Sequence, residues 1–185
     1  MHRSILVLKS TTMSKLRSNL QTRTKYSIIT VALSATLFII ATITLSKPFT
    51  IITTAHHHCK IETSHFALTW IHSVDKTPWV EFYTRIDEGF LLTRTQFRTF
   101  GAGVPHEGRV LESHNGMIHY QMDQYMPEIN WVIDRDVRST ILINNDLPWE
   151  IYKETDRYSE VQIRNESLNF WQRLTMRNCH ESPSI

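Results

Sequence analysis

The apolar positions of this chain follow two different patterns, and the first is a single unbroken run. From Ser27 to Ser46, twenty residues pass without a charged residue, a proline or a glycine. At about 1.5 Å of rise per residue, a helix of this length spans the roughly 30 Å hydrocarbon core of a bilayer. Its serines and threonines are tolerable there, because a hydroxyl in a helix can donate to a carbonyl one turn earlier. The run predicts an uncleaved transmembrane signal anchor at 27–46, preceded by a basic tail at 1–26.

Beyond the anchor, the pattern changes to short runs of β-branched and aromatic residues separated by turn signals. Phe66 to Trp70 alternates large apolar residues with small or polar ones, which is typical of a strand. Asn115-Gly116 is the strongest hairpin signal, because both residue types accept the positive φ of a type I′ turn. The expected strands are Phe66–Trp70, Trp79–Ile86, Phe90–Phe100, Val110–Ser113, Met117–Gln121, Ile129–Ile133, Thr140–Ile143, Glu150–Tyr152, Val161–Ile163 and Phe170–Met176.

These strands predict a mostly β domain at 61–177, an antiparallel β-sandwich or small barrel, since no run has convincing helical spacing. The segment 47–60 lacks an amphipathic period and is expected to be a stem. The polar tail at 178–185 is expected to lack order. Within the long third strand, alternation should place four side chains on one face: Leu91, Thr93, Thr95 and Phe97.

The charges are distributed unevenly along the chain. Six of the 20 Lys and Arg residues precede Ser27, together with none of the 18 acidic residues. The remaining 14 basic residues face all 18 acidic ones, which leaves the rest of the chain with a charge of −4. A mildly acidic domain is a poor partner for a phosphate backbone, so we expect no nucleic-acid partner. Basic residues before a membrane span stay in the cytoplasm, so the domain is expected on the other side.

Two cysteines, Cys59 and Cys179, lie near opposite ends of the expected domain. In an oxidising compartment they could form a disulfide, and closing so long a loop would contribute roughly 4 kcal/mol in the chain-entropy model. Alternatively, both are free thiols in poorly ordered flanks, because the sequence does not show that the two positions meet.

His72 and Ser73 end the first expected strand, and Asp75 and Glu81 follow closely. If Phe66 and Trp70 point inward, His72 shares their face. We expect a buried His72 held by Glu81 of the neighbouring strand, with ligand contact as an alternative. A hydrolase or metal-dependent enzyme using His72, Asp75 and Glu81 is a further alternative. Adjacent strand residues point to opposite faces and the chain has no nucleophile elbow, which argues against a His72–Ser73 pair.

Two of the five glycines of the chain fall in Gly101-Ala102-Gly103-Val104-Pro105. This clustering indicates backbone torsions or close approaches that a side chain would prevent. The loop could present amides to a ligand, or it could be the tight corner where a long strand leaves the sheet.

A third cluster is the contiguous run His56, His57, His58 and Cys59. Imidazole and thiolate are ligands for zinc or copper. Neighbouring side chains diverge, however, and the run lacks the spacing of a structural zinc site. It is therefore a weak candidate metal site, with a polar stem as the alternative.

Two motifs in order carry a family resemblance. Phe66 to Tyr83 followed by Phe97 to Pro105 resembles the bacterial domain of unknown function 1850 family. The matching positions are His72, Ser73, Val74, Pro78, Glu81, Phe100, Gly101, Ala102, Gly103, Pro105 and Gly116. The resemblance covers about Phe66 to Ile143. It implies a small, mostly β, secreted or anchored protein whose relatives are often encoded beside tripartite ATP-independent periplasmic (TRAP) transporters of the TAXI type.

These observations predict a single-pass inner-membrane protein with a cytoplasmic N-terminus and a periplasmic domain. Its expected role is that of an accessory or binding protein of a TRAP-type solute transporter, with no catalysis and no cofactor. The expected partner is the membrane subunit or the solute-binding subunit of the transporter. The candidate binding residues are His72, Ser73, Glu81, Gly101, Ala102, Gly103 and Pro105.

Overall fold

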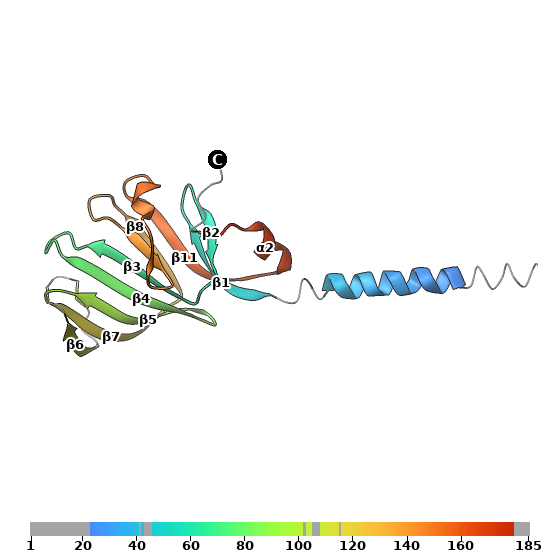
Figure 1. Ribbon diagram of the computed structural model, residues 1–185, viewed down its shortest axis with the longest axis horizontal. Helices are drawn as coiled ribbons and strands as arrows, with labels where there is room; N and C mark the ends of the chain where they lie inside the picture. The colour runs from blue at the N-terminus through green and yellow to red at the C-terminus, as the bar shows by residue number, and fades with distance from the viewer. Residues whose placement is uncertain are drawn as a thin grey trace, which may run out of the picture. The chain divides into compact units, whose positions relative to one another are not determined.

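A computed structural model describes residues 23–40, 42, 46–101, 103–104, 108–114 and 116–179 of the chain (Figure 1). The chain divides into two units, with the boundary between Leu45 and Ser46. The basic tail before Arg23 and the last six residues of the expected C-terminal tail lie outside the described residues.

The N-terminal unit contains a helix over Arg23–Ile40. Its threonines donate back to carbonyls one turn earlier, as expected: Thr30 Oγ1 lies 3.0 Å from the carbonyl oxygen of Tyr26, and Thr36 Oγ1 lies 2.9 Å from that of Ala32. Within the described part of the chain, this is the one helix long and apolar enough to cross a membrane, and a signal sequence has the same properties. The helix begins at Arg23, before the predicted start at Ser27, and 43–45 of the predicted span are not described.

Two antiparallel sheets form the second unit (Figure 1). Sheet A has the strand order β2-β1-β11-β8 and sheet B has the order β10-β9-β3-β4-β5-β7-β6. The strands are β1 (Lys47–Thr53), β2 (His58–Ile61), β3 (His65–Ile71), β4 (Pro78–Ile86), β5 (Gly89–Phe97), β6 (Arg109–His114), β7 (Met117–Met126), β8 (Glu128–Ile133), β9 (Thr140–Ile143), β10 (Leu147–Trp149) and β11 (Ser159–Leu168). The predicted sandwich is confirmed, and the alternative of a closed barrel is wrong.

The core lies between the two sheets. Sheet B contributes Phe66, Leu68, Tyr83, Phe90 and Ile141, and sheet A contributes Ile52, Ile129, Ile133, Val161 and Ile163. The Asn115-Gly116 hairpin is confirmed, since His114 pairs with Met117 and Gly116 has a φ of 71°.

The segment predicted as a stem is part of sheet A. Within β1, Phe49, Thr50, Ile51 and Ile52 are all buried in succession. Ile52 belongs to the central core, whereas Phe49 and Ile51 form a second cluster with Leu168 on the other face of the sheet. A strand covered on both faces shows no alternation of apolar and polar residues. The absence of a two-residue period in 47–53 is therefore explained by a strand that is buried on both faces.

The predicted face of the third strand is wrong in its first half. The buried side chains of β5 are Phe90, Leu92, Thr95 and Phe97, so the phase changes after Leu92. A β-bulge explains the change: Tyr83 pairs with Leu92 and Phe82 pairs with Arg94, which leaves Thr93 as the extra residue. A bulge inserts one residue and inverts the alternation beyond it.

Two segments predicted as strands are helical. Ile151–Lys153 forms a short 3-10 helix, η1, directly after β10, and Ile151 is fully buried. Phe170–Thr175 forms the helix α2. Asn169 and Gln172 form a reciprocal capping box at its start, each side chain accepting from the other's backbone N–H at 2.9 Å. This pair begins the helix and ends β11.

Cys59 and Cys179 form a disulfide across 120 residues, which decides between the two sequence alternatives. Both are buried, at 6% and 8% exposure. The start of the predicted disordered tail is therefore ordered, and Asn178 pairs in parallel with Lys60 of β2.

Arg85 of β4 connects sheet B to sheet A. Its guanidinium donates to Thr50 Oγ1 at 3.1 Å and to three backbone carbonyls at 3.1–3.3 Å: those of Ile61, Glu62 and Thr63. Burial lowers the pKa of this arginine.

Candidate functional site

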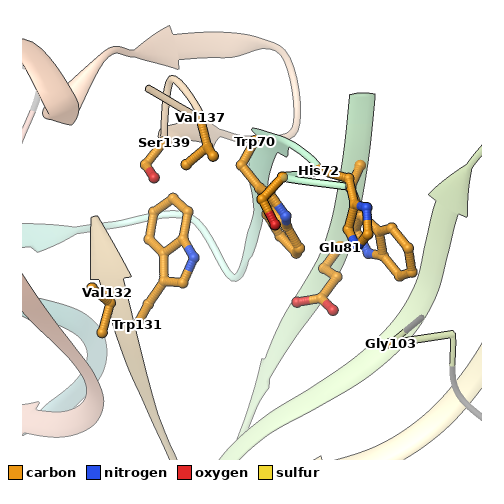
Figure 2. A pocket seen from close by; sticks show the side chains of 10 residues that line it. Trp70, His72, Glu81, Gly103, Trp131, Val132, Val137 and Ser139 are labelled. Atoms are coloured by element: carbon orange, nitrogen blue, oxygen red, sulfur yellow. The ribbon is translucent and has the colours of Figure 1, made fainter. Parts of the chain in front are cut away.

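A cavity of about 390 Å³ lies between the two sheets (Figure 2). Its walls come from β3, β4 and β8 and from three connecting segments, and its lining residues are Trp70, His72, Ser73, Trp79, Glu81, Gly103, Trp131, Val132, Val137 and Ser139. Trp79 and Ser139 are buried in it, whereas Ser73, Gly103 and Val132 are exposed at its opening. The volume falls in the range of small-molecule sites, roughly 300–1,000 Å³.

Strand register places the polar and aromatic groups of the cavity on one surface. Leu68 pairs with Glu81 and Trp70 pairs with Trp79, so these four side chains share the inner face of sheet B. Trp131 reaches the same space from β8 of sheet A. The Trp70 and Trp79 rings are stacked with centroids 6.0 Å apart, and the Trp131 ring lies 6.2 Å from that of Trp70 at a tilt of 57°.

Glu81 is the acidic group of the cavity. Figure 2 shows its carboxyl group turned toward the open space beside Trp131. The Tyr83 hydroxyl donates to Glu81 Oε2 at 2.7 Å. Burial raises the pKa of this carboxyl, and the Tyr83 hydroxyl and the nearby Trp79 indole lower it by a smaller amount. The Trp79 indole N–H is close enough to lower the pKa of this carboxyl, but it makes no well-aligned hydrogen bond with any described residue.

His72 pairs with Asp75, not with Glu81 as predicted from the strand pattern. The His72 Nδ1 atom lies 3.2 Å from Asp75 Oδ2 and 3.3 Å from the backbone nitrogen of Asp75. A neutral imidazole can accept from that N–H, and a protonated one can donate to the carboxylate. The imidazole is also stacked on Trp79, with ring centroids 5.4 Å apart. The pair lies in a tight turn beyond the end of β3, and this change of direction brings Asp75 back to His72.

The glycine loop contributes to the cavity and also makes a close approach. A Cβ atom on Gly101 would lie 3.3 Å from Asp75 Oδ2, and Gly103 has a φ of +86° and lines the cavity. The Val104 N–H donates to the Gly101 carbonyl at 3.4 Å, and the Val104 side chain packs on the core. Ala102 and Pro105 lie outside the described residues.

A family model described as a domain of unknown function (DUF1850) matches residues 66–148. Residues 66–148 of the chain are similar to the DUF1850 family. The matched segment contains every residue that lines the cavity, so the site is a property of the DUF1850 domain itself. Neither the curated proteins nor the solved structures gave a match to the chain.

The histidine cluster lies outside the matched DUF1850 segment, and its side chains diverge. His56 Nε2 lies 3.2 Å from Asp156 Oδ2, and His57 Nε2 lies 3.5 Å from Glu154 Oε2. His58 bonds to Thr53, with Nδ1 3.1 Å from Oγ1. Because Cys59 is in a disulfide, its sulfur is not a thiolate, and the prediction of Cys59 as a metal ligand is wrong. Across the described part of the chain, no group of three His, Cys, Asp or Glu side chains could hold a metal ion.

The sequence predicted some of the residues that line the DUF1850 cavity. It identified His72, Ser73, Glu81 and Gly103, which the fold brings together around one space. It missed the aromatic walls and the far side, namely Trp70, Trp79, Trp131, Val132, Val137 and Ser139, as ligand-facing groups. One signal existed: four of the five tryptophans lie on expected strands, and tryptophan is rarely fully buried.

Proposed function

We propose that this protein is a membrane-anchored extracytoplasmic binding or accessory subunit of a TRAP-type solute transport system. The observation that carries the binding role is the cavity between the sheets, which gathers aromatic and polar side chains from three strands. Pockets of this size with a few convergent polar groups are the usual form of a small-molecule site. The transporter partner is the expectation attached to the family resemblance.

Two features support a location outside the cytosol. The disulfide between Cys59 and Cys179 belongs to an oxidising compartment, because cytosolic thiols are kept reduced. Basic residues precede the apolar helix, which favours a cytoplasmic N-terminus. A reporter enzyme fused after Ile185 should therefore be active beyond the membrane. Activity of that fusion in the cytosol alone would contradict the proposed topology.

The partner is tested by isolating the tagged full chain in mild detergent and identifying what is recovered with it. We expect a TRAP membrane subunit or solute-binding subunit. Val74 is 70% exposed in the turn after β3, next to His72, and Leu174 is 65% exposed on α2. Val74→Asp should reduce recovery of the partner, whereas Leu174→Asp should not. If the unaltered chain recovers no transport component, the accessory role is wrong.

A second candidate function is a hydrolase, which the contact between His72 and Asp75 favours. An imidazole oriented by a carboxylate is the usual general base, and the raised pKa of Glu81 would suit a general acid. The Ser73 hydroxyl makes no hydrogen bond to His72 among the described residues, so no nucleophile is placed. Screening ester and amide substrates with the unaltered chain and with His72→Ala tests this function. Equal activity of the two chains would exclude it.

A further inference from the structure

The cavity has the wall chemistry of a cation site. Three indole rings line one space, from Trp70 and Trp79 of sheet B and Trp131 of sheet A. The Trp79 ring is itself stacked on His72 and on Phe97, with centroids 5.4 and 4.9 Å apart, so Trp70 and Trp131 are the rings left to contact a ligand. The face of an indole carries a negative quadrupole potential that attracts cations, and the attraction strengthens where water is excluded. Trp79 is only 4% exposed, so its part of the cavity is shielded from solvent.

The ionisable groups of the cavity add negative potential. The Glu81 carboxyl group points into the open space (Figure 2). Its Oε2 atom accepts from the Tyr83 hydroxyl. The imidazole of His72 has an acidic neighbour, since its Nδ1 atom lies 3.2 Å from Asp75 Oδ2. No lysine or arginine is among the described residues that line the cavity. Arg94 of the neighbouring strand β5 pairs with Phe82 on the outer face of sheet B, and its guanidinium lies 4.1 Å from the centre of that ring.

We propose that this cavity binds a small organic cation, a methylated or quaternary ammonium group on a compact body, between the Trp70 and Trp131 rings and the Glu81 carboxylate. The proposal deepens the binding role given above and rests on it. A compact ammonium fits a space of about 390 Å³, and the aromatic walls replace the water that its methyl groups lose. An anionic solute would enter without a cation to receive it and would face the carboxylate of Glu81.

Proton linkage follows from the same geometry. When no cation is bound, burial raises the pKa of the Glu81 carboxyl and so favours its neutral form. A bound cation favours the carboxylate, so binding at low pH must release a proton. Affinity for the cation should therefore rise as the pH rises through the pKa of Glu81 and then level off. His72 also lines the cavity and Asp75 lies 3.2 Å from it, so His72→Gln is the variant that separates the effect of this pair from that of Glu81.

The test compares three probes of nearly the same shape by tryptophan fluorescence and calorimetry on the full chain in detergent. Choline carries the cation, 3,3-dimethylbutan-1-ol is its neutral carbon isostere, and 3,3-dimethylbutanoate is an anion of similar size. We expect choline to bind at least about tenfold more tightly than the alcohol, a difference of about 1.4 kcal/mol, and the anion to bind most weakly.

Matched variants identify the groups responsible. Glu81→Gln keeps the acceptor for Tyr83 and should reduce choline affinity to that of the neutral alcohol while leaving the alcohol unchanged. Trp131→Leu should weaken choline about tenfold. The controls are Glu160→Gln and Trp171→Leu, two exposed positions outside the cavity that should leave all three affinities unchanged.

Three results would overturn the proposal: no detectable binding of choline, equal affinity for choline and its neutral isostere, or choline affinity unchanged in Glu81→Gln. Tighter binding of the alcohol or the anion would show that the cavity binds ligands and that the cation class is wrong. Choline binding without recovery of a transport component would overturn the accessory role and leave the cation site standing. The two proposals therefore fail separately.

Discussion

The disulfide between Cys59 and Cys179 should be the largest single contribution to stability in this domain. It joins β2 to the segment after α2 and closes a loop of 120 residues. In the chain-entropy model, a cross-link over such a loop lowers the conformational entropy of the unfolded chain by an amount worth about 5 kcal/mol, slightly more than the roughly 4 kcal/mol expected from the sequence. Single domains are stable by roughly 5–15 kcal/mol, so the bond accounts for a large part of the total.

The perturbation is the double variant Cys59→Ala/Cys179→Ala in the full chain. Unfolding in urea is followed by tryptophan fluorescence, which reports on the β-domain because all five tryptophans lie beyond Leu45. With an m-value of about 2 kcal/mol per M, a loss of about 5 kcal/mol lowers the midpoint by about 2.5 M.

Reduction of the unaltered chain with dithiothreitol is the control, because it opens the bond while keeping both buried sulfur atoms. If the shift arises from chain entropy, the reduced chain and the alanine variant should unfold at nearly the same urea concentration. The backbone bonds from Lys60 N to Arg177 O and from Cys179 N to Lys60 O, at 2.9 and 3.1 Å, could instead hold the segment unaided. A midpoint shift below about 0.5 M would show this and refute the reasoning.

Three further predictions concern single side chains. The folded state raises the pKa of Glu81 above 4.5, so its stabilising contribution is complete below the pKa of the unfolded chain and is lost as the pH rises through the folded value. Glu81→Gln should therefore be more stable than the unaltered chain at about pH 7 and similar at about pH 4, as measured by urea midpoints. Arg85→Met removes two hydrogen bonds to sheet A and two to the segment that connects β2 to β3, and it should cost about 2–4 kcal/mol in a urea titration, with Arg85→Lys intermediate; equal midpoints would contradict a bridging role. Asn169→Ala removes the cap of α2 and should lower the free energy of unfolding by about 1 kcal/mol, whereas Asn169→Asp should retain most of that stability. If the two variants are destabilised equally, the capping role of Asn169 is contradicted.

The fold was predictable where each strand has one face in the core. The strands β3, β4, β8 and β9 were expected at nearly their observed positions, because alternation and turn residues both marked them. β1 was missed for a physical reason: Ile51 and Ile52 are both buried, on opposite faces of sheet A, and such a strand has no period of two. The bulge at Thr93 was invisible because it shifts the phase without leaving a turn residue.

The helix α2 could have been recognised. Its six residues contain several β-favouring side chains, which suggested a strand, but Asn169 and Gln172 have the spacing of a capping box. The candidate site was half predictable. His72 and Ser73 directly follow β3 and Glu81 lies on the adjacent strand β4, whereas Trp131 joins them only through the packing of sheet A on sheet B. No local pattern encodes that approach.

The order of strands in sheet A has a consequence for how the chain assembles. β11 lies between β1 and β8 and pairs with both, although β1 is made first and β11 last. Until residues 159–168 exist, the β1–β2 hairpin and β8 have no common neighbour, and the apolar inner face of sheet B has no complete cover. All strands of sheet B are therefore synthesised before sheet A, which covers the inner face of sheet B, can be completed. Any chain interrupted before Leu168 would carry that bare surface into the aqueous phase, where it would favour aggregation over folding.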